Sequence, residues 1–181
     1  MKYYLAYTFR SVSRMPLASD SLHTIDLFAG CGGLSLGLQK AGFETLLYSE
    51  INDDAANTFS ANLGDKIPRY GDIDELLDVK EVERLRALWE RSGKRVDLLT
   101  GGPPCQGYSA IGHRRTHRVE RIQVPSNHLF LRMIEAIKIF KPRMFLFENV
   151  KGLVTGSWET RGEPGQIWKD VREEFRKLRD Y

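Results

Sequence analysis

The segment Gly101–Ser109 combines a nucleophile with residues that can hold it rigidly. Its sequence is GGPPCQGYS, and it follows Val96–Thr100, a short and mainly apolar run of the kind that forms a buried strand. Two glycines and two prolines force the backbone out of a sheet and into a fixed turn. Cys105 is therefore predicted at the carboxyl end of a strand, where open α/β sheets bind their ligands. This position favours a nucleophilic thiol, with a buried cysteine of no chemical role as the alternative.

A second residue that could do chemistry is Glu148, which directly follows the apolar run Met144–Phe147. Such a run is typical of a strand that is buried on both faces. An acid at the tip of a buried strand is a candidate proton donor. The alternative is a solvated or helix-capping carboxylate.

A glycine turn, Gly30–Gly33, follows the predicted strand Thr24–Phe28 and precedes a predicted helix. Such a turn lets the backbone approach a ligand closely. Glu50 lies 18 residues after Gly32, about the distance at which an acceptor for a ribose diol is expected. The dinucleotide fingerprint G-x-G-x-x-G is incomplete, because Ser35 stands at the third glycine position. The turn and Glu50 together predict a nucleoside site, with a tight turn and a surface acid as the alternative.

A basic segment follows the Cys105 loop directly. Its sequence, GHRRTHRVER over Gly112–Arg121, contains four arginines and a single acid. Such a segment beside a nucleophile suits a substrate with a phosphate backbone. A solvated surface loop is the alternative.

Composition limits the class of protein. A chain of 181 residues fits one domain, and 41% hydrophobic and 28% charged residues are ordinary for a folded globular protein. No apolar run approaches the roughly 18 residues of a membrane span. Two cysteines give no disulfide framework, so a reducing, cytoplasmic compartment is expected. The formal net charge of +3 permits a nucleic-acid partner without requiring one.

Strand and helix patterns alternate along the chain. This order predicts an α/β fold with a doubly wound, mainly parallel sheet. The predicted strands are Thr24–Phe28, Glu44–Ser49, Asp72–Ile73, Val96–Leu99 and Met144–Phe147. The predicted helices are Leu34–Ala41, Asp53–Asn62, Lys80–Arg91, Leu129–Phe140 and Gln166–Arg179.

Three segments, taken in order, resemble successive signatures of the cytosine-C5 DNA methyltransferases. They are Asp26–Gly33 (DLFAGCGG), Gly102–Gln106 (GPPCQ) and Glu148–Val150 (ENV), and their separations also match. The resemblance spans roughly residues 23 to 155. It implies a Rossmann-like methyltransferase core that uses S-adenosylmethionine.

The resemblance also implies a mechanism. The Cys105 thiolate adds to C6 of a cytosine, which makes C5 nucleophilic enough to take the methyl group. Glu148 assists at N3 of the ring. The cytosine is buried in double-stranded DNA, so it must first be flipped out of the helix.

The remaining site residues are carried over by the same resemblance. Those expected to bind the cofactor are Phe28, Gly30, Gly32, Glu50, Ile51, Asp72, Pro104 and Leu129. Those expected to contact nucleic acid are Gln106, Ser109, Arg114, Arg115 and Arg118. No metal site is expected, because the cysteines and histidines lack the spacing of zinc ligands.

The sequence also departs from the family pattern. Members usually continue with further strands and a target-recognition domain, whereas this chain stops at Tyr181. We therefore expect an N-terminal extension over residues 1–22 and an incomplete methyltransferase domain over residues 23–181. The strand at Met144–Phe147 would then be an exposed sheet edge that attracts a partner strand. On this interpretation the chain is a fragment, or one subunit of a split enzyme completed by a second polypeptide.

Three alternatives stay open at this point. The first is a catalytically silent subunit that binds S-adenosylmethionine. The second is a transfer-RNA cytosine-C5 methyltransferase, since a similar branch of the family modifies RNA. The third is an oxidoreductase that uses the glycine turn for a dinucleotide.

Overall fold

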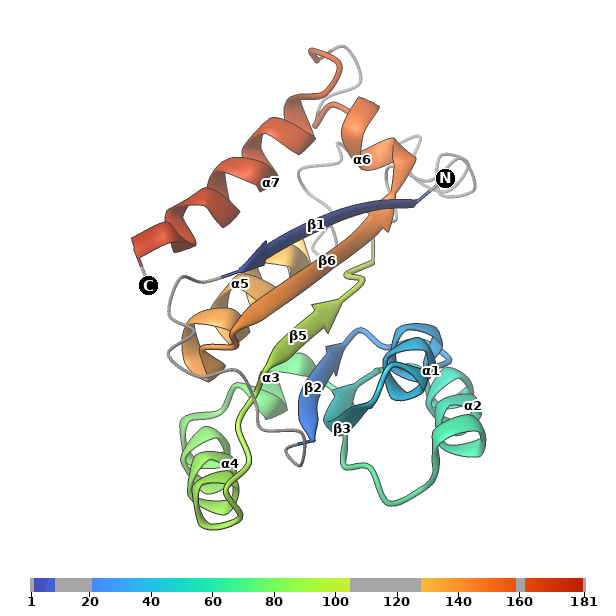
Figure 1. Ribbon diagram of the computed structural model, residues 1–181. Coiled ribbons are helices and arrows are strands. Elements are labelled where there is room, and N and C mark those ends of the chain that lie inside the picture. The colour runs from blue at the N-terminus through green and yellow to red at the C-terminus, as the bar shows by residue number, and fades with distance from the viewer. Residues whose placement is uncertain (1, 9–20, 105–127, 159–161, 181) are drawn as a thin grey trace.

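The computed structural model describes residues 2–8, 21–104, 128–158 and 162–180 of the chain. These residues form a six-stranded sheet in the order β1-β6-β5-β2-β3-β4 with helices packed around it (Figure 1). The strands are β1 (Lys2–Thr8), β2 (Leu22–Leu27), β3 (Phe43–Ser49), β4 (Arg69–Tyr70), β5 (Leu98–Gly101) and β6 (Met144–Val150). The helices are α1 (Gly33–Lys40), α2 (Asp53–Leu63), α3 (Ile73–Leu76), α4 (Val79–Arg91), α5 (Leu129–Phe140), α6 (Lys151–Thr155) and α7 (Gln166–Arg176), with a 3₁₀ turn at Lys177–Asp180.

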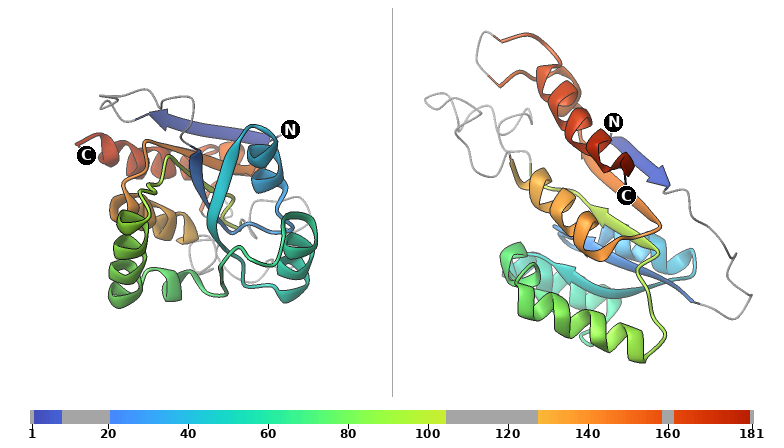
Figure 2. Two further views of the ribbon diagram at one scale, coloured as in Figure 1. Left: turned by 60° about the horizontal axis from the view of Figure 1, so that its bottom comes forward. Right: turned by 90° about the vertical axis from the view of Figure 1, so that its left-hand side faces the viewer.

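The sheet is parallel from β6 to β4, and β1 alone runs antiparallel to its neighbour. Helices α1 and α2 lie on one side of the strands, and α4 and α5 lie on the other (Figure 2). This is the doubly wound, mainly parallel α/β fold that the alternation of strands and helices predicts.

Apolar side chains from the strands and helices meet in the core. The alternate residues Phe145 and Phe147 of β6 are buried, and both rings contact Phe175 of α7 at centroid distances of 5.2 and 5.0 Å. Helix α4 begins where the Asp78 side chain accepts hydrogen bonds from two backbone amides. It buries an apolar stripe, but Leu88, which the helical pattern assigns to that stripe, is exposed.

Two sequence-based expectations about the strands are wrong. The strand expected at Asp72–Ile73 lies earlier, at Arg69–Tyr70, and Asp72 instead caps α3, its side chain accepting a hydrogen bond from the Asp74 amide at 3.0 Å. The run Met144–Phe147 does not form an open edge, because all seven residues of β1 pair with β6. Residues 2–8 of the expected N-terminal extension therefore belong to the sheet.

Strand β6 also continues further than the apolar run suggests. It extends to Val150, so Glu148 lies within the strand rather than just after it. No helix in the described residues is both long and apolar enough to cross a membrane.

Candidate cofactor and catalytic site

A cavity of about 360 Å³ opens where the strands β2 to β5 end. Its size is within the range of small-molecule sites, and its position is the one at which open parallel sheets bind ligands. Ten residues line it: Phe28, Ser49, Glu50, Ile51, Gly71, Asp72, Ile73, Gly102, Pro104 and Leu129.

Six of the eight residues expected to bind a cofactor lie around this cavity. They are Phe28, Glu50, Ile51, Asp72, Pro104 and Leu129. The other two, Gly30 and Gly32, are not among its lining residues. Four lining residues were not predicted: Ser49, Gly71, Ile73 and Gly102. Ser49 ends β3, Gly71 and Gly102 directly follow β4 and β5, and Ile73 begins α3.

Backbone amides fix the Glu50 carboxylate at the cavity wall. Its Oε2 accepts a hydrogen bond from the Gly30 amide at 2.8 Å, and its Oε1 accepts one from the Asn52 amide at 2.8 Å. Each carboxylate oxygen has a second lone pair that can accept a further hydrogen bond. Glu50 is thus a rigid acceptor that can take two hydroxyl groups, as a ribose diol requires.

Gly30 and Gly32 do not line the cavity but support the structure around it in different ways. Gly30 has a φ of +56°, and its amide binds Glu50. Gly32 has a φ of +85°, and a Cβ added there would lie 2.7 Å from Leu63 Cδ1 and 2.8 Å from Phe59 Cδ2. Glycine at position 32 therefore lets the start of α1 pack directly against α2.

A buried carboxyl, Asp26, lies behind the turn. Its oxygens accept hydrogen bonds from the hydroxyls of Ser35 at 2.6 Å and Thr100 at 2.8 Å, which ties β2 to α1 and β5. Burial raises the pKa of Asp26 to about 6, and the two hydroxyl hydrogen bonds oppose that rise. Ser35 breaks the dinucleotide fingerprint in the sequence, and here its hydroxyl binds this carboxyl.

Replacing Asp26 by asparagine is expected to remove a pH dependence of stability. The pKa of Asp26 is about 6 in the folded chain and 3.8 for the ordinary group. The unfolded chain therefore releases this proton first as the pH rises. The free energy of unfolding of the wild type should fall by up to about 3 kcal/mol between pH 4 and 6 through this group, and stay at the lower value above pH 6.

Urea unfolding of the wild type and Asp26→Asn at several pH values between 4 and 7 measures this difference. All other titrating groups are common to both proteins, so they cancel. Two parallel curves of unfolding free energy against pH would contradict the assignment.

An ion pair links helices α3 and α5 beside the cavity. Asp72 precedes α3, and Leu129 is the first residue of α5. Arg132 of α5 pairs with Asp74 of α3 at 2.7 Å. This ion pair joins the two elements from which Asp72 and Leu129 reach the cavity.

Glu148 lies beside the first residues after β5. A Cβ added to Gly102 would lie 2.9 Å from Glu148 Oε2, so only glycine lets the carboxylate approach the chain here. The next residue, Asn149, is buried and donates a hydrogen bond from Nδ2 to the Pro103 carbonyl at 3.2 Å. Asn149 thereby joins the strand of Glu148 to the Pro-Pro turn that precedes Cys105.

Several predicted site residues lie outside the described part of the chain. They are Cys105 and the expected nucleic-acid contacts Gln106, Ser109, Arg114, Arg115 and Arg118. Among the residues that the structure does describe, no three His, Cys, Asp or Glu side chains are grouped so that they could hold a metal ion.

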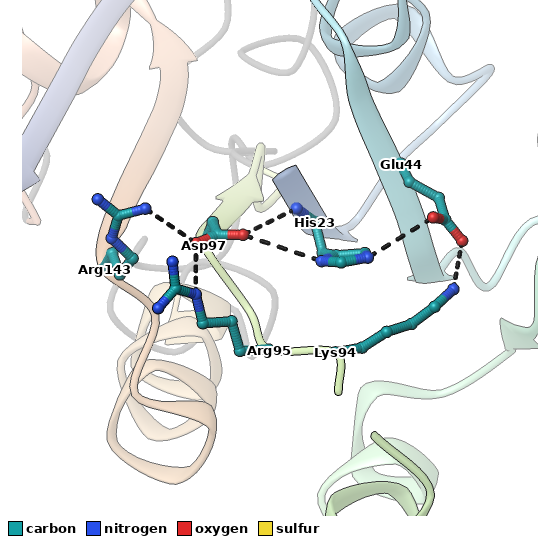
Figure 3. Close-up of polar contacts among 6 residues, drawn as sticks. All are labelled: His23, Glu44, Lys94, Arg95, Asp97 and Arg143. Atoms are coloured by element: carbon teal, nitrogen blue, oxygen red, sulfur yellow. Dashed lines mark hydrogen bonds and ion pairs between the residues drawn. The ribbon is translucent and has the colours of Figure 1, made fainter. Parts of the chain in front are cut away.

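A second polar cluster lies at the opposite ends of the strands (Figure 3). The buried Asp97 accepts hydrogen bonds from the His23 amide at 3.0 Å and from Arg95 and Arg143, each at 3.1 Å. Glu44 pairs with Lys94 and lies 3.5 Å from His23 Nε2. These contacts join the starts of neighbouring strands and lie away from the cavity.

The open parallel sheet, with a ligand-sized cavity at its carboxyl ends, defines a Rossmann-like α/β domain. The sequence model of the C-5 cytosine-specific DNA methylase family matches residues 22–179. The chain therefore belongs to this family, and the resemblance inferred from its three motifs is confirmed.

Individual relatives agree with this assignment. The chain is 37% identical over 160 residues to Type II methyltransferase M1.HphI of Haemophilus parahaemolyticus, covering 87% of this chain and 38% of that protein. It is 36% identical over 155 residues to Type II methyltransferase M.DdeI of Desulfomicrobium norvegicum, covering 85% of this chain and 33% of that protein. The chain thus spans about two fifths or less of the length of these relatives.

Solved structures share the fold. One is described as a DNA modification methyltransferase encoded within a prophage (E. coli); it has a TM-score of 0.63 and 28% identity, covering 87% of this chain and 38% of that one. The S. pombe Dnmt2 methyltransferase has a TM-score of 0.52 at 19% identity, covering 86% of this chain and 40% of that one, and so supports the fold alone.

Proposed function

We propose that the chain forms the cofactor-binding and catalytic part of a DNA (cytosine-5)-methyltransferase. The observation that carries this proposal is the cavity at the strand ends, around which six of the eight expected cofactor residues lie. The family membership of the chain supports it.

The cavity residues fit S-adenosylmethionine, which supplies the methyl group. The fixed Glu50 carboxylate would accept the two ribose hydroxyls, and Asp72 would accept a hydrogen bond from the adenine amino group. Ile51 is 75% exposed and lines the cavity, so its apolar side chain is available to cover the adenine ring. Burying that side chain would add to the affinity.

Catalysis is proposed to use Cys105 and Glu148. The thiolate of Cys105 forms a bond to C6 of cytosine, and Glu148 hydrogen-bonds to N3 as the ring accepts the electron pair. C5 would then form a bond to the methyl group as the bond between that methyl and the sulfonium sulfur breaks, which leaves S-adenosylhomocysteine as the product. Loss of the C5 proton to a base and departure of the Cys105 thiolate from C6 restore the aromatic ring. The Asn149–Pro103 hydrogen bond holds the two motifs in register.

Recognition of a DNA sequence is proposed to come from polypeptide beyond these 181 residues, either more of the same chain or a second subunit. This proposal rests on the greater length of the relatives. The edge of β6 gives it no support, since β1 pairs with that edge. We propose a cytoplasmic location, associated with the nucleoid if the source is a bacterium, because the proposed DNA substrate lies there.

Replacing Glu50 by alanine is expected to weaken S-adenosylmethionine binding by about 10- to 150-fold. This corresponds to the loss of about 1.5–3 kcal/mol for hydrogen bonds to a charged group. Isothermal titration calorimetry measures the affinity. Glu44→Ala is the matched control, because Glu44 lies near the start of β3, at the end of that strand far from the cavity. The affinity of this variant for S-adenosylmethionine should equal that of the wild type. Equal affinities for all three proteins would contradict the role of Glu50.

A methyl-transfer assay separates the proposed function from its alternatives. Labelled S-adenosylmethionine is incubated with mixed-sequence DNA or transfer RNA and the chain, alone and with extract of its source cells. Label in DNA that is lost in Cys105→Ser supports the proposal, and label in transfer RNA alone supports the RNA enzyme. Cofactor binding without label indicates a silent subunit, and binding of NAD in place of S-adenosylmethionine indicates an oxidoreductase.

A further inference from the structure

Phe28 has a backbone conformation that bulky residues rarely adopt. Its φ is +55°, in the left-handed region, where a Cβ crowds the following carbonyl oxygen. Among the described residues, the other non-glycine residue with a positive φ is Lys141, which caps the end of α5, a common place for this conformation. Phe28 instead directly follows β2 and lines the cofactor cavity. Backbone strain at such a position points to a role in ligand binding.

Three consecutive amides at this turn donate to two consecutive residues at the end of β3. The Phe28 amide donates to Ser49 Oγ at 3.2 Å, and the Ala29 amide donates to the Ser49 carbonyl at 2.9 Å. The Gly30 amide donates to Glu50 Oε2 at 2.8 Å. Strands β2 and β3 pair in parallel and lie side by side (Figure 1), so these bonds tie two neighbouring strand ends together. The bond to the strained residue itself is the one made by the Ser49 side chain.

We propose that Ser49 is a positioning residue for the cofactor site. Its hydroxyl oxygen holds Phe28 in the left-handed conformation that places this residue against both the apolar core and the cavity. This inference rests on the proposed binding of S-adenosylmethionine in that cavity. It gives a role to a lining residue that the sequence does not single out.

The surroundings of Ser49 suit this role. The residue is only 2% exposed, so water has little access to its hydroxyl and competes weakly for the Phe28 amide. A residue without a side-chain acceptor would keep the bond to Ala29 and lose the bond to Phe28. Phe28 could then relax to a negative φ, and only the molecules that keep the left-handed conformation would be ready to bind the cofactor. The affinity falls in proportion to that fraction.

Replacing Ser49 by alanine tests the proposal. The affinity for S-adenosylmethionine should fall by about three- to tenfold, which corresponds to about 0.7–1.4 kcal/mol, the range for one hydrogen bond. NMR couplings that report φ should show a positive φ at residue 28 in the free wild type, whereas most molecules of the free variant should leave that region. Ser60→Ala is the matched control, because it removes the hydroxyl of a serine on α2 that bonds Tyr48, the neighbour of Ser49, at 3.3 Å. That variant should equal the wild type in both measurements.

A double-mutant cycle with Phe28→Gly separates positioning from a direct contact between Ser49 and the cofactor. Glycine adopts a positive φ without steric cost, so Phe28→Gly removes the strain together with the ring. The affinity of this variant is lower, but adding Ser49→Ala should change it by less than about twofold. An equal loss in both backgrounds would overturn the proposal. A single Ser49→Ala variant with wild-type affinity, or with a positive φ at residue 28 in all molecules, would overturn it as well.

Ser49→Cys provides the same test if the alanine variant does not fold. It keeps a side chain of similar size, but sulfur is only a weak acceptor, so the same loss of affinity and the same change of φ are expected. Failure of the proposed function is seen separately, as a wild type that does not bind S-adenosylmethionine. In that case the φ of residue 28 in the free proteins still shows whether Ser49 holds Phe28.

Discussion

Replacing Glu148 by glutamine is expected to lower the rate of methyl transfer to cytosine by about 10²- to 10⁴-fold, the usual contribution of a positioned acid or base. Glutamine keeps the size and shape of the side chain, so its contact with the chain at Gly102 should be preserved. It cannot supply a carboxyl proton to N3 when the Cys105 thiolate adds to the ring. Glu148 is not among the residues that line the cavity, so S-adenosylmethionine binding should stay within about twofold of the wild type.

Labelled-methyl transfer to DNA in the active assembly measures this effect, and calorimetry measures cofactor binding in the same preparations. Glu90→Gln makes the identical chemical change on the exposed side of α4 and should behave as the wild type. A Glu148→Gln protein that methylates DNA at the wild-type rate would exclude Glu148 from the reaction. A protein that loses cofactor binding and activity together would show that Glu148 shapes the cavity instead.

The part of the site predicted from the sequence is the part that follows from strand order. Parallel strands bring their carboxyl ends to one edge, so residues that follow strands far apart in the sequence meet there. Phe28 and Glu50 fall into this group, and so do the unpredicted Ser49 and Gly102, each adjacent to a residue that the sequence does single out. Leu129 begins a helix rather than ending a strand, and only the family resemblance identifies it.

The errors come from short elements and long-range pairing. β4 has two residues, too few for an alternating pattern, so the predicted position of this strand is three residues late. Ile73 is accordingly not predicted as a lining residue of the cavity. β1 pairs with a strand more than 130 residues away, and no local pattern reports such a partner. The hydrogen bond from Asn149 to Pro103 spans 46 residues and is equally invisible in the sequence.

Ser35 shows how a mismatch to a motif can mislead. In the sequence it weakens the dinucleotide fingerprint, because glycine is expected at that position. In the structure its hydroxyl binds the buried Asp26, and the glycine that packing requires is Gly32. Helix α1 is therefore joined to β2 by the hydrogen bond from Ser35 to Asp26. The dinucleotide fingerprint would place a glycine at this position for close packing of the helix on the sheet.

Replacing Gly32 by alanine is expected to lower the free energy of unfolding by about 2–5 kcal/mol and to weaken cofactor binding. A non-glycine residue at a left-handed φ of +85° costs about 1–2 kcal/mol, and an extra methyl group in a packed site costs about 1–3 kcal/mol more. The new Cβ would meet Phe59, whose ring is fully buried and stacked on Tyr48 at a centroid distance of 3.7 Å. Because Phe59 cannot move aside cheaply, α1 must shift away from α2, and the turn that supports Glu50 must shift with it.

Two other glycines in the same segment serve as controls that separate the backbone cost of a left-handed φ from the packing cost of the added methyl group. Gly30 has a φ of +56° but open space around its Cβ position, so Gly30→Ala should show only the backbone cost of about 1–2 kcal/mol. Gly37 lies inside α1 with open space, and Gly37→Ala should stabilise the chain by about 0.5–1 kcal/mol. Urea unfolding should therefore order the stabilities as Gly37→Ala, wild type, Gly30→Ala and Gly32→Ala. A Gly32 variant no less stable than the Gly30 variant would show that α1 does not pack against α2 through this glycine, and the rigid support of Glu50 would then need another explanation.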